Sequence, residues 1–567
     1  MKKRAITMSP LESGQKVSAT SASTVSRQGI VANAALCAPM DGVEITSRDS
    51  SGAVQDTTYS DHKGQWRLSN LALSQVVTFS KDGFVQKEIS AVDLPDVVRL
   101  LEDELIGYQE KLWFLPGDDV TAFVHAPTRF SATLYRHGLV KEMALDLGVH
   151  ELCRQNIPNG YFVDTGLDWQ ATFTYQLPLD ISPGIYSLCL EADDQERFAI
   201  PFIVSTPAEQ AGQKSRLLVL ASTNTWQSYN LWGGRSRYRN FEDGHSPDYV
   251  VSQLLLWRRI KRQIIKFLPN TLIQFLLKLL GKLEPEPWKF KRLSIQRPFT
   301  NCNLEDDHTL EPFCNHLAAG EWRLLAWLER QNILYDIVSG YEFHTQPKLL
   351  ENYRAVIFST HCEYWTCDMY EQLKYYHEQE KLWIINVSGN TMYRQIEFFE
   401  DGSTHCVSLN FDKSCADETQ LLGGRFSIVD YGTCAPYKIL LPDHWVFDGI
   451  SKQKKIFGET SLNQNTSKKG RRYDPGRAGM KNGLIGIGAS GWEMDKLSKT
   501  APKDIKIVAK GLNQSGGADM LVRDPQERRG GMFSASAICF SGSLLVDGIA
   551  ATIVQNVITK ALVHHPC

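Results

Sequence analysis

The sequence has no long hydrophobic run and almost no net charge. The longest charge-free run of its most apolar region, residues 267–277, has 11 residues and contains a proline, which is too short to cross a bilayer. The 61 basic and 64 acidic residues give a formal net charge of -3, so no overall field attracts nucleic acid. We therefore expect neither a membrane-spanning protein nor a nucleic-acid-binding one.

The chain also lacks a cysteine motif of the kind that binds zinc. Its 12 cysteines are scattered, and the spacing of the closest pair, Cys362 and Cys367, matches no common zinc motif. Residues 1–13 carry two lysines and an arginine without the apolar core of a signal peptide. Scattered cysteines without a signal peptide fit a reducing compartment, so the sequence predicts a cytoplasmic protein.

Length and composition are those of a multidomain globular protein. The 567 residues, 43% of them hydrophobic and 22% charged, suggest three or four domains with ordinary cores. Residues 1–28 are polar and rich in serine and threonine, so we expect a disordered tail there. Residues 254–292 read as a basic helical insertion, which either packs on its own domain or contacts a membrane surface or a partner.

Two β-sandwich domains are expected at the start of the chain. Residues 29–101 contain short alternating runs separated by turns rich in aspartate and glycine, and residues 102–210 show a second series of the same kind. The first series resembles the carboxypeptidase regulatory-like module, which implies a structural or interaction role. For the second we expect an antiparallel, jelly-roll or lectin-like sandwich.

From residue 211 to residue 567 the pattern predicts an α/β domain with a mostly parallel sheet. Continuous apolar runs alternate with a helical pattern over residues 321–331, which is typical of buried parallel strands. The runs expected to form strands are 217–220, 335–338, 355–359 and 382–387. Ligand-binding residues of such sheets follow the carboxyl ends of the strands, so the segments directly after these runs are the candidate site.

Several chemically capable side chains occur after these strands or in a later glycine-rich turn. His361 and Glu363 alternate, so in an extended segment they face the same side, where they can bind a metal or act in acid–base chemistry. Tyr229 could bind a hard cation, or its segment could be a polar loop held by hydrogen bonds. Asn390 could orient a substrate or be a turn residue, and Glu493 could be a buried base or a solvated carboxylate.

A different metal site is also conceivable from the histidines. His361 and Glu363 together with His344 or His377 would form a site of two histidines and one carboxylate, which is typical of iron oxygenases. The sequence alone leaves this alternative open.

A series of motifs in the same order resembles the large subunit of the N,N-dimethylformamidase family. That resemblance covers about residues 107–562 and implies a glutamine-amidotransferase-like sheet domain. It also implies a mononuclear ferric ion held by two tyrosines and one glutamate, and hydrolysis of an amide C–N bond. The motifs are TNTWQSYNLWGG, WLER, HCEYW, SGN, GWEMD and GGMFSA.

The resemblance carries over to individual residues of this sequence. It implies that Glu363 and Tyr229 bind the metal and that His361, Asn390 and Glu493 are catalytic. The second tyrosine is expected near Arg297-Pro298-Phe299, where this chain has phenylalanine, so Tyr238 is the candidate that replaces it. The expected substrate pocket consists of Trp226, Asn230, Phe299 and Phe533.

The expected partners are a small-molecule amide substrate and either further copies of the chain or a small helical subunit, as in the family enzyme. The ferric ion would polarise the amide carbonyl, with Glu493 as base and His361 and Asn390 at the oxyanion. The alternative is a non-catalytic binding protein that has lost the metal and associates with a partner, a glycan or a membrane surface. Phe299 distinguishes the two: the alternative gains if Phe299 fills the second ligand position and no other tyrosine reaches the metal.

Overall fold

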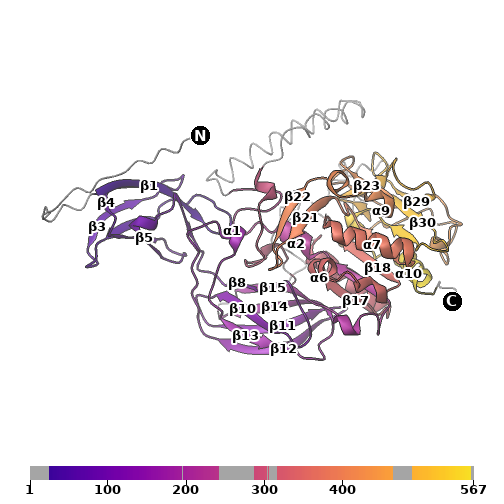
Figure 1. The fold of residues 1–567 in the computed structure, drawn as a ribbon, viewed down its shortest axis with the longest axis horizontal. Helices are drawn as coiled ribbons and strands as arrows, with labels where there is room; N and C mark the ends of the chain where they lie inside the picture. Colours follow the sequence, from indigo (N-terminus) through magenta and orange to yellow (C-terminus); the bar gives the residue numbers. More distant parts are fainter. Residues whose placement is uncertain are drawn as a thin grey trace, which may run out of the picture. The chain divides into compact units, whose positions relative to one another are not determined.

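The computed structural model describes residues 24–193, 196–241, 287–302, 304, 316–463 and 488–563. The chain forms two compact units (Figure 1). The smaller unit contains the residues up to 98 except 33–38 and 83–85, and the larger unit contains all others. The candidate site lies entirely in the larger unit.

The smaller unit consists of short strands in two sheets, one in the order β4-β1-β7 and one in the order β3-β2-β5-β6. Their alternating side chains, such as Trp66 and Leu68 of β4, form its core. β1 begins at Thr24, which pairs with Ala72, so residues 24–28 form a strand and the prediction of disorder is wrong for them. Residues 1–23 lie outside the described residues. The strands are β1 Thr24–Asn33, β2 Glu44–Arg48, β3 Val54–Tyr59, β4 Gln65–Ala72, β5 Val76–Ser80, β6 Lys87–Ser90 and β7 Val97–Leu100.

The larger unit begins with two further β-sheets, in the orders β13-β10-β8 and β12-β11-β14-β15-β9. All their pairings are antiparallel among the described strands except that of β15 with β9. Buried side chains of both sheets, among them Val120, Leu134 and Phe202, form one core. The strands are β8 Ile106–Gln109, β9 Trp113–Phe114, β10 Asp119–His125, β11 Phe130–His137, β12 Lys141–His150, β13 Phe173–Gln176, β14 Gly184–Ala192 and β15 Arg197–Val204.

The rest of the larger unit is built on a nine-stranded sheet in the order β17-β16-β18-β20-β31-β30-β29-β25-β26. The first five strands are parallel and the others antiparallel, so the sheet is mixed where the sequence predicted a mostly parallel one. The apolar runs marked only the parallel half. The strands are β16 Leu217–Ala221, β17 Asp336–Ser339, β18 Ala355–Thr360, β20 Trp383–Ser388, β25 Tyr437–Ile439, β26 Ile456–Phe457, β29 Ile505–Gly511, β30 Asp519–Arg523 and β31 Met532–Ser534.

Helices cover both faces of the parallel half (Figure 1). Leu217 and Val219 of β16 pack in one core with α5 (Ala318–Arg330) and α10 (Gly548–Val563). Leu218 and Leu220 pack in a second core with α6 (Gly340–Thr345) and α7 (Cys367–Gln379). Burial on both faces explains why β16 reads as a continuous apolar run.

The β-sandwich contacts the sheet domain along α5. Arg136 forms an ion pair of 2.6 Å with Glu329, and the Trp322 indole donates to the Gly138 carbonyl at 2.7 Å. The ring of His137 lies edge-on to that of Trp322, with 4.8 Å between their centroids. These contacts place the two parts in one compact unit.

The larger unit also contains shorter elements. They are α1 Phe162–Thr165, α2 Thr223–Tyr229, β19 Tyr364–Trp365, β21 Arg394–Phe398, β22 Thr404–Ser408, α8 Phe411–Ser414, α9 Thr419–Leu422, β23 Gly424–Ser427, β24 Cys434–Ala435, β27 Ser490–Gly491 and β28 Met494–Leu497.

Two observations bear on the expectations about compartment and membrane. Cys367 and Cys415 form a disulfide, whereas the sequence suggested scattered thiols. No described helix has both the length and the apolar character needed to cross a membrane. Residues 254–286 of the predicted basic insertion lie outside the described residues, and Pro287–Phe290 form a short 3-10 helix.

Candidate active site

The candidate residues meet at the carboxyl ends of β16, β18 and β20. These strands are neighbours in the sheet and run parallel, so the segments that follow them emerge at one edge. The segment after β16 is helix α2 rather than the predicted loop, and it ends at Tyr229. The buried carboxylate of Glu321 holds its start by accepting from the Ser222 amide at 3.0 Å and the Trp226 indole at 2.9 Å.

The backbone at the site adopts left-handed conformations at residues other than glycine. Thr360, just before His361, has φ 55°, Asn390 has φ 54°, and Trp492, just before Glu493, has φ 70°. Such conformations cost about 1–3 kcal/mol each and persist where the surrounding structure enforces them, often at functional sites. The three turns that deliver the predicted catalytic residues are thus all strained.

One carboxylate oxygen is the centre of the cluster. Glu363 Oε2 accepts a hydrogen bond from the Tyr238 hydroxyl and lies 3.3 Å from the Tyr229 hydroxyl and 3.2 Å from His361 Nε2. The rings of Tyr229 and Tyr238 have centroids 4.3 Å apart, and the Tyr364 hydroxyl donates to that of Tyr238 at 3.0 Å. Two phenol oxygens and one carboxylate oxygen therefore converge, and their role as metal ligands stays a prediction.

The three predicted catalytic residues join this cluster through His361. His361 Nε2 lies 2.9 Å from the Tyr229 hydroxyl and 3.8 Å from Glu493 Oε2. Its other nitrogen, Nδ1, donates to the Gly389 carbonyl at 3.0 Å, which fixes Nε2 towards the carboxylates. Asn390 Nδ2 donates to Glu493 Oε2 at 2.7 Å. The structure thus brings all six predicted ligand and catalytic residues together.

The pKa values of the two carboxylates at the site, Glu363 and Glu493, are shifted in opposite directions. Burial favours the protonated form of Glu363, but Arg394 and His361 outweigh it and hold the pKa of Glu363 below its usual range. Burial raises the pKa of Glu493, and the charge of Glu363 adds to this effect although His361 opposes it. A carboxylate with a lowered pKa beside one with a raised pKa is the division of roles expected for acid–base catalysis.

The donor set is of the kind that suits a hard cation. The described residues contain no cluster of three or more His, Cys, Asp or Glu side chains arranged to hold a metal, so a metal here would need the phenol oxygens. Burial, followed by the charge of Glu363, raises the pKa values of Tyr229 and Tyr238. A bound cation reverses this effect because it stabilises the deprotonated ligand. Phenolate and carboxylate oxygens are hard donors that suit ferric iron.

Two buried polar atoms near the cluster have no hydrogen-bond partner among the described residues. One is Asn390 Oδ1 and the other is Nδ1 of His316. The ring of His316 lies 4.9 Å from that of Tyr229, 5.2 Å from that of His361 and 4.4 Å from that of Trp492, measured between centroids. Both atoms thus belong to residues of the cluster or directly beside it.

The residues predicted to line the substrate pocket are buried in the surrounding core. The Trp226 indole donates to Glu321, and the Asn230 amide donates to the Pro298 carbonyl at 2.9 Å. Phe299 and Phe533 belong to the core cluster that also contains Trp226. Their described contacts hold α2 and β31 in the core. A role in substrate binding stays a prediction.

The histidines of the alternative two-histidine site bond elsewhere. His344 Nδ1 lies 3.0 Å from the Thr366 hydroxyl at the start of α7, and His377 Nδ1 donates to the Leu382 carbonyl at 2.8 Å. The histidine whose ring lies against His361 is His316, which follows no strand and has no local sequence signal. The sequence pattern also gives no sign of Arg394, although it follows Asn390 in the same segment.

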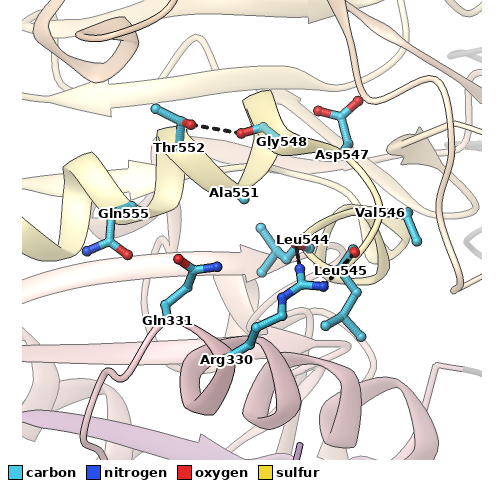
Figure 2. Close-up of a pocket in the computed structure, with 10 residues that line it drawn as sticks. All are labelled: Arg330, Gln331, Leu544, Leu545, Val546, Asp547, Gly548, Ala551, Thr552 and Gln555. Carbon is cyan, nitrogen blue, oxygen red and sulfur yellow. Dashed lines mark hydrogen bonds between the residues drawn. The ribbon is translucent and has the colours of Figure 1, made fainter.

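A surface depression of about 440 Å³ lies away from the cluster. Figure 2 shows it between the end of α5 and the start of α10, where Arg330 donates to the carbonyls of Leu544 and Leu545 at 3.0 Å each. None of the predicted site residues lines this depression.

Comparison with known proteins gives one extensive match. The family model described as N,N-dimethylformamidase beta subunit-like, C-terminal, matches residues 137–552. No curated protein matches the chain.

The similarities to solved structures are weak. They include E. coli alpha-2-macroglobulin, with 13% identity over 30% of this chain and 11% of that one and a TM-score of 0.12. The major pilin subunit BcpA of Bacillus cereus is 11% identical over 32% of this chain and 69% of the pilin chain, with a TM-score of 0.13. A DUF3823 family protein from Parabacteroides merdae is 10% identical over 32% of this chain and 100% of its own chain, with a TM-score of 0.13. The chain spans about a tenth of alpha-2-macroglobulin, and TM-scores this low carry no argument.

Proposed function

Because the chain belongs to the N,N-dimethylformamidase beta subunit-like family over residues 137–552, we propose that it hydrolyses the C–N bond of an amide with the help of a mononuclear ferric ion. The observation that carries the proposal is the meeting of the Tyr229 and Tyr238 hydroxyls at one oxygen of Glu363. These three side chains would hold the ion. When bound, the ion supplies Lewis acidity, which polarises the amide carbonyl or activates water.

Glu493 is the general base of the proposed reaction. It is buried, its pKa is raised by that burial, and its Oε2 is held by Asn390 Nδ2 at 2.7 Å. Glu493 would take a proton from water as the water oxygen forms its bond to the amide carbon. The same proton then passes to the amide nitrogen as the C–N bond breaks, so that the amine leaves neutral.

His361 is the group that stabilises the oxyanion. Nδ1 is engaged by the Gly389 carbonyl, so Nε2 is the nitrogen that faces the reacting atoms. Burial disfavours the charged imidazole, but the nearby Glu493 and Glu363 carboxylates reverse this and raise the pKa of His361. A protonated Nε2 can donate to the developing oxyanion, a contact worth about 2.7–4 kcal/mol in comparable sites.

The hydrogen bond to Glu493 changes what Asn390 is expected to do. One N–H of its carboxamide is engaged by the base, so its first task is to position Glu493. The unpaired Oδ1 is then available to accept a hydrogen bond from the attacking water.

Tyr238 also bears on the alternative of a binding protein without metal. That alternative gains strength if Phe299 fills the second ligand position and no other tyrosine reaches the metal. The Tyr238 hydroxyl bonds to Glu363 Oε2, so a second phenol oxygen is present. We therefore favour the enzyme.

The experiment that tests the proposal measures bound iron and the visible spectrum of the purified protein. Stoichiometric iron with a tyrosinate-to-ferric absorption band, followed by hydrolysis of one or more amides in a panel that begins with N,N-dimethylformamide, is the expected result. A protein that binds no iron after reconstitution with ferric salt contradicts the proposal.

Further parts of the proposal rest on the sequence, through its resemblances to known families and through its composition. We propose that the nine-stranded sheet domain is glutamine-amidotransferase-like and that the N-terminal unit is a carboxypeptidase regulatory-like module with a role in association. The proposed partners are a small-molecule amide, further copies of the chain or a small helical subunit, and a membrane surface contacted by residues 254–292. A cytoplasmic location is part of the same proposal.

A further inference from the structure

The two oxygens of Glu363 have entirely different neighbours. Oε2 faces the Tyr229 and Tyr238 hydroxyls and His361 Nε2. Oε1 accepts from Arg394 Nε at 2.7 Å. The carboxylate is buried, with 1% of its side chain exposed, so neither oxygen has solvent as an alternative partner.

Arg394 is held in place by its backbone and by two aromatic rings. Its backbone amide and that of Tyr393 both donate to the Glu363 carbonyl, at 3.1 and 2.9 Å. The guanidinium carbon lies 5.2 Å from the ring centroid of Tyr238 and 5.7 Å from that of Tyr393. The arginine therefore contacts two of the three proposed ligands, Glu363 and Tyr238.

We propose, on the basis of the proposed ferric site, that Arg394 is a positioning residue that restricts Glu363 to binding the metal through Oε2 alone. A carboxylate can bind a metal through one oxygen or through both. The hydrogen bond from Nε occupies Oε1, which leaves Oε2 as the donor that points between the tyrosines. Such outer contacts orient ligands, and their loss typically lowers metal affinity about 10–100-fold.

The positive charge of Arg394 should weaken cation binding, whereas its hydrogen bond to Glu363 should strengthen it. The test therefore has to separate the two effects. A guanidinium near the site repels a cation, whereas the Nε–H orients its ligand. Arg394→Gln places an amide N–H at the same number of bonds from the backbone as Nε and removes the charge. Arg394→Met has similar length with neither charge nor donor. These two variants therefore differ chiefly in the hydrogen bond to Oε1.

The experiment loads the full-length protein and both variants with ferric ion. It measures the affinity by competition with a chelator, the visible absorption band, and the splitting between the antisymmetric and symmetric carboxylate stretches. That splitting is wider for binding through one oxygen than through two. Arg425→Met is the matched control, because Arg425 also pairs with carboxylates, those of Asp412, Asp417 and Glu418, but has no described contact with the cluster.

We expect Arg394→Met to lose about 10–100-fold in ferric affinity, to shift the absorption band and to narrow the carboxylate splitting. Arg394→Gln and Arg425→Met should keep the band and the splitting of the wild type. A folded Arg394→Met protein with wild-type affinity, band and splitting overturns the inference. Equal changes in Arg394→Met and Arg394→Gln also overturn it, because the charge would then be the cause.

The remaining outcomes are also decisive. Should Arg394→Met fail to fold, a wild-type splitting in Arg394→Gln supports the hydrogen bond as its cause, and a narrowed splitting opposes it. A wild-type protein that binds no ferric ion overturns the proposed function itself. A wild type that binds iron beside unaffected variants overturns only the role of Arg394.

Discussion

The carboxamide nitrogen of Asn390 lies 2.7 Å from Glu493 Oε2, and the backbone of Asn390 has a φ of 54°. The side chain and the backbone of one residue thus serve the site in different ways. Asn390→Gly removes the hydrogen bond and suits the backbone, whereas Asn390→Ala removes the same bond and keeps the strain.

We expect both variants to hydrolyse amides about 100-fold more slowly, because a misplaced base costs about that much. Asn390→Ala should also unfold at a lower temperature than Asn390→Gly, since a residue with a Cβ at positive φ costs about 1–2 kcal/mol. Steady-state kinetics and thermal denaturation measure the two effects. Equal activity of Asn390→Gly and the wild type would show that Asn390 does not position the base.

Three tyrosines at the cluster can each be changed to phenylalanine, which removes one hydroxyl oxygen and leaves the ring in place. Tyr229→Phe and Tyr238→Phe each remove a proposed ligand, and we expect each to lose most bound iron and to change the visible band. Tyr364→Phe removes a hydroxyl that donates to Tyr238 but is not a proposed ligand, so it should keep its iron. Iron content by atomic absorption checks all three, and a Tyr238→Phe protein with full iron and an unchanged band would exclude Tyr238 as a ligand.

A substitution at Gly389 tests how closely the turns that carry His361, Asn390 and Glu493 pack against one another. A Cβ at this position would lie 2.5 Å from the Glu493 carbonyl oxygen and 2.6 Å from the Ile538 nitrogen, and both atoms belong to the backbone. We expect Gly389→Ala to destabilise the protein by about 1–3 kcal/mol and to lower activity, because Glu493 must move. Gly548→Ala is the control, since a Cβ there meets nothing within 4 Å, and equal stability of the two variants would contradict the argument.

The parallel half of the sheet and most of the site could be predicted from the sequence. Burial on both faces leaves a continuous apolar run such as Leu217 to Leu220, and the edge where such strands end is fixed by their direction. This reasoning places His361 and Asn390 at one edge from the sequence pattern, and the family resemblance adds Glu493 to them.

The features that the sequence did not reveal depend on contacts that leave no periodic pattern. The antiparallel half of the sheet contains strands as short as Ile456–Phe457, which carry too few residues to show an alternation. His316 reaches His361 only through the tertiary fold. A polar loop was one interpretation of the segment that forms helix α2. Its Thr, Asn and Ser residues are poor helix formers, and the buried Glu321 that holds its start comes from a distant helix.

The buried His137 should make the stability of the protein depend on pH, because it lies at the contact between the β-sandwich and α5. The imidazole is buried, its Nε2 lies 2.8 Å from the Ser187 hydroxyl, and its ring packs on Trp322. Burial lowers the pKa of His137 to about 3, and the charges of Lys141 and Arg136 add to the effect. The histidine of the unfolded chain titrates near 6.5, so between about pH 6.5 and 3 the unfolded state binds a proton that the folded state does not.

Stability therefore falls as the pH drops through this window, by at most about 1.4 kcal/mol per pH unit from this one group. Above about pH 6.5 both states are neutral and His137 contributes no pH dependence. We expect His137→Gln to melt at a lower temperature than the wild type at pH 7 but to lose less stability between pH 6.5 and 4.5, because glutamine takes up no proton. Thermal denaturation across this range measures the difference, with the exposed His62→Gln as control. Parallel pH profiles for the wild type and His137→Gln would mean that another group causes the acid sensitivity of this interface.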